Sequence, residues 1–259
     1  MTQFAVITGA SRGIGRALTL ELTSRGLTVI AISQNETALQ SLKALNPEKI
    51  KVISADITTV IGREKILNTL RDVKINFLIN NAGIINPIGA LHKASEIEIR
   101  KLFETNFLAP IFLTNAFIPH FHESDGRILN VTSVAADEAV PGILAYCTSK
   151  SALNMWTAGL KKELPSNIVA ADVIPGEVAT DMQGDLRSAP VDSFPLATEF
   201  KEAEKHGTLI RVAVCAEFLS DVLLKTTPEK FSSKKWNIYH DYNKPIPQPF
   251  NKKKLASDS

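Results

Sequence analysis

Short apolar segments rich in branched residues alternate along the chain with segments in which apolar residues recur every three to four positions. The short segments predict buried strands at residues 4–8, 28–33, 50–54, 75–80, 127–132 and 168–174. The helical spacing occurs between them, at residues 14–25, 36–45 and 61–71. This alternation implies right-handed crossovers and a parallel sheet covered on both faces. We therefore expect an α/β fold with a doubly wound parallel sheet of the Rossmann type, in a single domain.

The middle of the chain contains a longer helical pattern. Ser95 and Glu98 have the spacing of a capping box, which predicts a helix that begins there and runs toward Phe121. Pro110 lies inside this pattern and is expected to bend the helix or to remove one of its hydrogen bonds.

The last third of the chain departs from the alternation. Residues 184–207 contain two prolines and follow the sixth predicted strand, which is typical of a mobile loop with a short helix that closes over a ligand. A last strand is predicted at residues 236–239. We expect the catalytic domain to span residues 1–243, and residues 244–259 to form an extended or disordered tail because they contain three prolines and a lysine triplet.

Composition narrows the function classes. The chain has 259 residues, of which 44% are hydrophobic, and its net charge of +2 comes without a basic stripe, so we expect no nucleic-acid partner. Cys147 and Cys215 lie far apart and outside any metal-binding pattern, so we expect neither a metal site nor a disulfide framework. The chain shows no basic leader region and no apolar run of about 20 residues, which favours a cytoplasmic protein with no membrane segment.

Tyr146 and Lys150 lie four positions apart at the start of a helical pattern. Residues at this spacing share one face of a helix, and a nearby ammonium lowers the pKa of a tyrosine from its usual value of about 10. Such a tyrosine is suited to proton transfer. A pair of this kind also occurs by chance, and then it is an exposed pair on a helix surface.

The segment TGASRGIG, residues 8–15, follows the first predicted strand and opens the first predicted helix. Glycines in this position allow the backbone to approach a pyrophosphate, whose charge is met by the amides at the helix N-terminus. Glycine-rich turns also occur for purely steric reasons.

Four motifs in order resemble those of the short-chain dehydrogenase/reductase family: TGASRGIG, the NNAG that ends at Gly83, Ser133 before YCTSK, and PGEVAT after the sixth predicted strand. The resemblance covers about residues 4–180. It implies that Tyr146 protonates a substrate carbonyl oxygen, that Lys150 lowers the tyrosine pKa and binds the nicotinamide ribose, and that Ser133 steadies the carbonyl oxygen. It also implies that Asn106 supports a water relay to the lysine. Without the resemblance, Ser133 would be read as a turn residue and Asn106 as a polar residue at a helix kink.

The resemblance also implies a set of cofactor contacts. Asp56 is expected at the adenine, although an aspartate at that position can equally cap a turn, and Thr180 is expected at the carboxamide. The full set of expected cofactor residues is Gly9, Ser11, Arg12, Gly13, Ile14, Gly15, Ser33, Asp56, Asn81, Ala82, Gly83, Tyr146, Lys150, Pro175, Gly176, Val178 and Thr180.

Ser33 ends the second predicted strand, where an acidic residue would repel a 2′-phosphate, and Arg12 offers a guanidinium suited to that phosphate. Both favour NADP(H), with NAD(H) possible. Gln34 argues against a preference for NADP(H), because many NADP-preferring members of the family have a second arginine at this position.

The function implied is reduction of a ketone or aldehyde, or oxidation of the alcohol, by a homo-oligomer whose substrate is a small molecule. A dehydratase or epimerase on the same fold and a regulator that senses the nucleotide are the alternatives. The presence of serine, tyrosine and lysine together favours the redox reaction.

Overall fold

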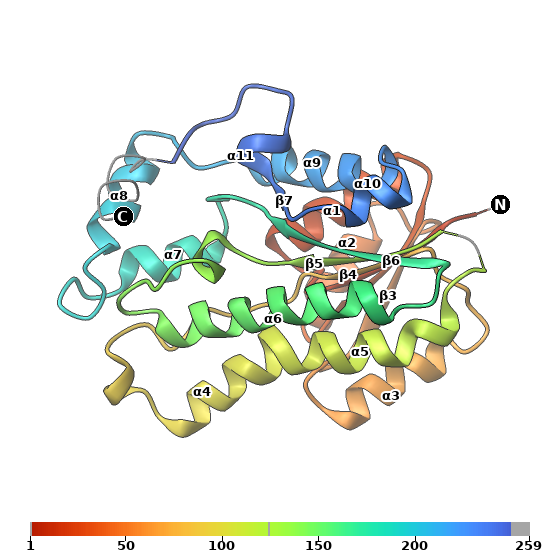
Figure 1. Cartoon of the computed structure of the whole chain (residues 1–259), viewed down its shortest axis with the longest axis horizontal. Coiled ribbons are helices and arrows are strands. Elements are labelled where there is room, and N and C mark those ends of the chain that lie inside the picture. The colour runs from red at the N-terminus through yellow and green to blue at the C-terminus, as the bar shows by residue number, and fades with distance from the viewer. Residues whose placement is uncertain (1, 124, 250–259) are drawn as a thin grey trace.

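A parallel sheet forms the centre of the protein in the computed structural model, which describes residues 2–123 and 125–249 (Figure 1). Within these residues the sheet has seven strands in the order β3-β2-β1-β4-β5-β6-β7. The chain places β2 and β3 on one side of β1 and then places β4 to β7 on the other side, so the strand order reverses between β1 and β4. Ligands of such sheets bind at the carboxyl ends of the strands at this point. The strands are β1 Phe4–Thr8, β2 Thr28–Ser33, β3 Ile50–Ser54, β4 Phe77–Asn80, β5 Gly126–Val131, β6 Ile168–Ile174 and β7 Trp236–Asn237.

Helices cover both faces of the sheet (Figure 1). One face is covered chiefly by α1, α2 and α9, and the other by α3, α5 and α6; each face has its own buried apolar cluster. The strands are therefore buried on both sides, which explains their continuous runs of branched residues. The α-helices are α1 Gly13–Ser24, α2 Glu36–Lys43, α3 Val60–Thr69, α4 Glu96–Phe103, α5 Ala109–Phe117, α6 Leu144–Glu163, α7 Asp181–Ser188, α8 Ala197–Lys205, α9 Val212–Leu224, α10 Pro228–Ser232 and α11 Ile238–Asp241.

The predicted α/β class and parallel sheet are confirmed. The fourth strand begins two residues later than predicted, because Ile75 makes only an isolated bridge to Phe121. The prediction of a last strand at residues 236–239 was wrong in its second half. The Asn237 side chain accepts a hydrogen bond from the Tyr239 backbone at 3.0 Å and begins α11, which ends the strand.

The capping box at Ser95 and Glu98 is confirmed as the start of α4. The helix then continues through a π-helical turn, Glu104–Leu108, into α5. Pro110 has no N–H to donate to the Asn106 carbonyl, which lies four residues earlier in this wide turn. The predicted disturbance at Pro110 is thus a local widening of one continuous helical segment.

Residues 184–207 contain more helix than the predicted loop with one short helix. They complete α7 and contain all of α8, and the two helices pack together at one end of the molecule (Figure 1). Arg187 pairs with Glu204 at 2.9 Å, and the Phe194 ring stacks on that of Phe200. These contacts supply a local core that the composition did not reveal.

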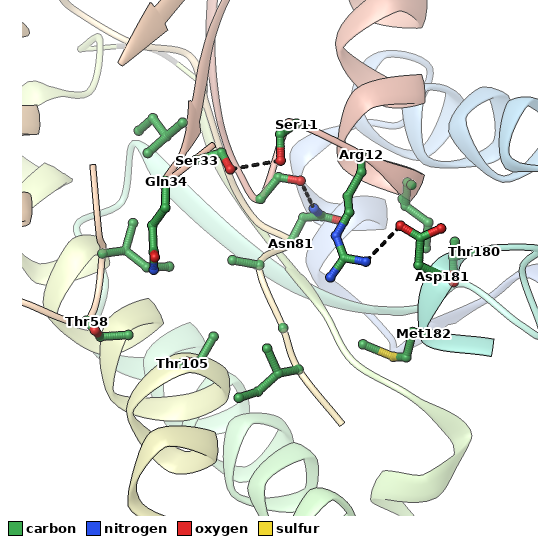
Figure 2. Close-up of a pocket in the computed structure, with 18 of the residues that line it drawn as sticks. Ser11, Arg12, Ser33, Gln34, Thr58, Asn81, Thr105, Thr180, Asp181 and Met182 are labelled. Carbon is green, nitrogen blue, oxygen red and sulfur yellow. Dashed lines mark hydrogen bonds and ion pairs between the residues drawn. The ribbon is translucent and has the colours of Figure 1, made fainter. Parts of the chain in front are cut away.

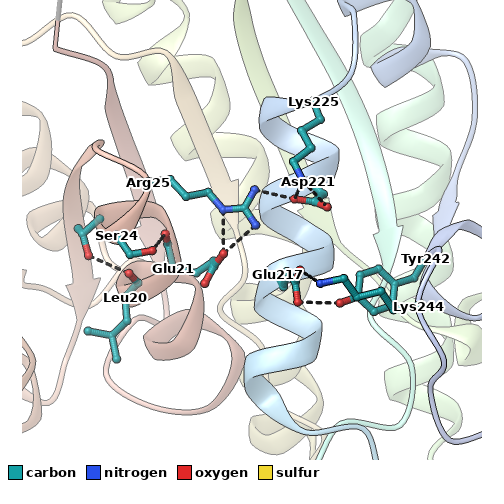
Figure 3. A network of polar contacts seen from close by, with 10 residues as sticks. Leu20, Glu21, Ser24, Arg25, Glu217, Asp221, Lys225, Tyr242 and Lys244 are labelled. Carbon is teal, nitrogen blue, oxygen red and sulfur yellow. Dashed lines mark hydrogen bonds and ion pairs between the residues drawn. The ribbon is translucent and has the colours of Figure 1, made fainter.

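The segment after α11 is held against α9 by a polar network (Figure 3). Glu217 accepts hydrogen bonds from the Tyr242 hydroxyl, at 2.8 Å, and from Lys244. On the same helix, Asp221 pairs at 2.6 Å with Arg25, which follows α1. Residues 244–249 have no regular secondary structure, and the rest of the predicted tail lies outside the described residues. No described helix has both the length and the apolar character needed to cross a membrane.

Candidate active site

A cleft of about 300 Å³ opens at the carboxyl ends of β1 and β4, where the strand order reverses. Figure 2 shows the glycine turn on one side of the cleft and the start of α7 on another. Of the residues predicted for the cofactor, the cleft is lined by Gly9, Ser11, Arg12, Gly13, Ile14, Ser33, Asn81, Ala82, Gly83 and Thr180. The structure therefore brings most of the predicted cofactor residues together.

The glycine turn is pressed closely against the loop after β4. Gly9 has φ +66°, and a Cβ there would lie 2.8 Å from the Ala82 Cα atom. A Cβ on Gly15 would lie 2.5 Å from both the Asn81 Nδ2 atom and the Gly9 carbonyl oxygen. The Asn81 amide donates to the Thr8 carbonyl oxygen at 2.8 Å, which fixes this close approach. The cradle leaves the start of α1 facing the cleft, as a bound pyrophosphate requires.

Two polar contacts involve the residues expected to determine cofactor preference. The Ser33 hydroxyl donates to the Ser11 hydroxyl at 2.8 Å, so the end of β2 and the glycine turn are directly linked. Arg12 donates to the Asp181 carboxylate at 2.8 Å, which links the glycine turn to the first residue of α7. Figure 2 shows both contacts.

The predicted catalytic residues gather where β5 ends and α6 begins. Tyr146 and Lys150 are buried on one face of α6, and the Lys150 ammonium lies 5.9 Å from the centroid of the Tyr146 ring. Ser133 follows β5 and forms a hydrogen bond with the Tyr146 hydroxyl. The Lys150 ammonium donates to the Val131 carbonyl oxygen at 2.9 Å.

The protonation states differ from the sequence-based expectation. Burial raises the pKa of Tyr146 to about 12, and the hydrogen bond with Ser133 offsets only part of that rise. Burial also lowers the pKa of Lys150 to about 8. A net lowering of the tyrosine pKa, as expected beside Lys150, is therefore not found in the protein alone, because desolvation of the phenol dominates the shift. At neutral pH the phenol keeps its proton.

Asn106 connects the wide turn before α5 to both the cleft and α6. Its side chain accepts from the Ile84 N–H at 2.9 Å and donates to the Ile84 carbonyl oxygen at 2.8 Å. It also donates to the Ser149 hydroxyl at 3.1 Å. Ile84 lines the cleft, so Asn106 positions one wall of the cleft relative to the helix that carries Tyr146.

Seven predicted cofactor residues do not line the cleft: Gly15, Asp56, Tyr146, Lys150, Pro175, Gly176 and Val178. The Asp56 carboxylate accepts from the Thr58 N–H and hydroxyl at 2.9 and 2.7 Å, so it caps the turn after β3 as the alternative interpretation proposed. Gly176 has φ +80° and packs against Ile210, in a segment that also contains Pro175 and Val178. These three residues shape the loop that leads to Thr180.

Nine further residues line the cleft, and the sequence analysis did not predict them as part of a cofactor site. Most of them stand at or just after the carboxyl end of a strand, and that position is the signal that could have identified them. They are Ile32, Gln34, Ala55, Ile57, Thr58, Ile84, Thr105, Asp181 and Met182.

Tyr146 is part of a buried apolar cluster. The cluster includes Ile143, Leu186 and Phe194, which come from the loop after β5, from α7 and from the segment before α8. Gly142 is required in this cluster, because a Cβ there would lie 2.8 Å from the Phe194 ring. Cys147 is also buried in the cluster.

Comparisons with known proteins agree with this geometry. Residues 3–190 match the family described as short chain dehydrogenase. An uncharacterized oxidoreductase of Schizosaccharomyces pombe is 35% identical over 232 residues, which cover 86% of this chain and 92% of the relative. A benzil reductase of Bacillus subtilis that forms (S)-benzoin is 32% identical, with 86% and 93% of the two chains covered. A short chain dehydrogenase/reductase structure from Saccharomyces cerevisiae has a TM-score of 0.85 at 26% identity and covers 94% of this chain and 97% of its own.

Proposed function

The chain belongs to the short chain dehydrogenase family, and from this premise we propose that it reduces a ketone or an aldehyde to an alcohol with NADPH. The observation that carries the proposal is the meeting of Tyr146, Ser133 and Lys150 beside a cleft whose glycine cradle fits a dinucleotide. The cofactor, when bound, supplies the hydride that reaches the carbonyl carbon.

Tyr146 supplies the proton in this proposal. A phenol with a pKa of about 12 is protonated at neutral pH, so it acts as an acid toward the carbonyl oxygen. The Ser133 hydroxyl, which forms a hydrogen bond with the phenol, also donates to that oxygen and stabilises the charge that develops there. Lys150 keeps its ammonium close to the ring and stabilises the phenolate that the proton transfer leaves.

The preference for NADP(H) over NAD(H) rests on two residues of the cleft. Ser33 ends β2 without a negative charge, and Arg12 in the glycine turn offers donors for a 2′-phosphate. Asn81 to Gly83 line the same cleft and face the adenosine half of the cofactor in this proposal.

The substrate is proposed to be an apolar carbonyl compound. Ile143, Leu186 and Phe194 are buried in one apolar cluster with Tyr146, so the proton donor lies against apolar side chains that exclude water. The Bacillus subtilis relative is named for benzil, an aromatic 1,2-diketone, which agrees with a site for a bulky apolar substrate.

A panel of ketones, aldehydes and 1,2-diketones, assayed by the consumption of NADPH and of NADH, tests the proposal. We expect NADPH-dependent reduction that is fastest with aromatic diketones and that the Tyr146→Phe variant does not catalyse. A protein that binds either cofactor but reduces no carbonyl compound would refute the proposed function.

We also propose that the protein acts in the cytoplasm as a homo-oligomer. Cell fractionation tests the location, and light scattering tests the oligomeric state.

A further inference from the structure

An ion pair crosses the cofactor cleft. Arg12 is the last residue before α1, Asp181 is the first residue of α7, and their side chains meet at 2.8 Å although 169 positions separate them. Figure 2 shows Ser33 and Gln34 on the opposite side of the cleft from Asp181, with Arg12 between them. The guanidinium is therefore directed away from the end of β2.

The position of the guanidinium bears on cofactor recognition. The end of β2 is where the adenosine ribose of a dinucleotide binds in this fold, so a 2′-phosphate would lie near Ser33. Arg12 must leave Asp181 to reach a phosphate there. The two side chains are 62% and 70% exposed, so water and salt weaken their ion pair, and the arginine can exchange its partner.

We propose that Asp181 sets the strength of the NADPH preference by competing with the 2′-phosphate for Arg12. This inference rests on the proposed function. With NADH, or without a cofactor, Arg12 remains on Asp181 and ties the glycine turn to α7. With NADPH, the phosphate takes the guanidinium and α7 loses its tie.

The competition also connects the cofactor to the substrate side of the site. The residue after Asp181 is Met182, which lines the cleft, and Leu186 on the same helix belongs to the apolar cluster around Tyr146. Release of Asp181 thus acts on a helix that contributes residues both to the cleft and to this cluster. Asp181 is a positioning residue in this account, since it acts through Arg12.

Calorimetric titration of NADPH and of NADH into four proteins tests the competition: the parent, Asp181→Asn, Arg12→Ala and the double variant. We expect Asp181→Asn to tighten NADPH binding about two- to fivefold and to leave NADH binding unchanged, which is the range that the free energy of an exposed ion pair allows. In the Arg12→Ala background the same change should have less than half of that effect. Asp185→Asn, on the exposed face of the same helix, is the matched control for the loss of one negative charge.

Three results would each overturn the inference. Asp181→Asn could weaken NADPH binding, which would make the carboxylate a support for Arg12 rather than a competitor. It could change the affinity for both cofactors equally. It could also tighten NADPH binding equally with and without Arg12, as simple charge repulsion would. Failure of the proposed function looks different, because the parent would then reduce no carbonyl compound whatever the affinities of the variants.

Discussion

Asn106 provides the sharpest test of how the site is held together. Its side chain is fully buried and makes three hydrogen bonds, two with the backbone of Ile84 and one with the Ser149 hydroxyl. Asn106→Ala removes all three. It leaves the Ile84 N–H and carbonyl oxygen without their partner.

The expected loss of stability follows from these contacts. Leaving one buried polar group unsatisfied costs about 1–3 kcal/mol, and the half-buried position of Ile84 allows some compensation by water. We therefore expect the free energy of unfolding to fall by about 2–4 kcal/mol. For a chain of this size the midpoint of thermal unfolding should fall by about 5–15 °C.

Chemical denaturation of the parent and the variant, followed by circular dichroism, measures the change. Asn115→Ala is the matched control, because Asn115 is exposed on α5 and its replacement should alter stability by less than about 0.5 kcal/mol. If the free energy of unfolding of Asn106→Ala differed from that of the parent by less than about 0.5 kcal/mol, the contacts to Ile84 would not contribute to stability. Cofactor affinity should fall in parallel, because Ile84 lines the cleft.

Three further predictions concern the site. Gly15→Ala should weaken NADPH binding at least about tenfold in calorimetry, since its Cβ would lie 2.5 Å from the Asn81 side chain; parental affinity would contradict the tight cradle. Lys150 should add stability between about pH 8 and pH 10.5, because the folded protein has released its proton while the unfolded chain still binds it. The buried thiols of Cys147 and Cys215, whose pKa values are raised, oppose this rise above about pH 9. Denaturation at several pH values should therefore show that the difference in stability between the parent and Lys150→Met grows by at most about 3 kcal/mol over this range, and a constant difference would contradict the prediction. Ser133→Ala should raise the pKa of Tyr146 further and lower kcat/KM about 10- to 1,000-fold without altering NADPH affinity, and a kcat/KM close to the parent's would exclude Ser133 from the reaction.

The strands were readily predicted because they are buried on both faces. Runs such as those of β2 and β6 contain almost only apolar residues, and such short runs between helical patterns have few alternatives to a central strand. The last strand was less predictable. Its end depends on the Asn237 side chain, which caps α11. The spacing of apolar residues does not predict a polar contact of this kind.

The candidate site was predictable only as far as its motifs reach. The glycine turn and the pair of Tyr146 and Lys150 are local patterns, so their positions on α1 and α6 followed from spacing. The ion pair between Arg12 and Asp181 joins residues 169 positions apart, and no local pattern indicates it. The raised pKa of Tyr146 has the same origin, because burial of the phenol depends on α4, α7 and the loops that pack around it.

The central claim is that Tyr146 donates the proton in a carbonyl reduction that uses NADPH. Tyr146→Phe removes only the hydroxyl and keeps the buried ring, so its kcat/KM for the best carbonyl substrate is the most direct measurement. The account predicts a fall of at least about 100-fold while the dissociation constant of NADPH, measured by calorimetry, stays within about twofold of the parent. Activity within a few-fold of the parent would contradict the claim, and so would a loss of activity that follows entirely from lost cofactor binding.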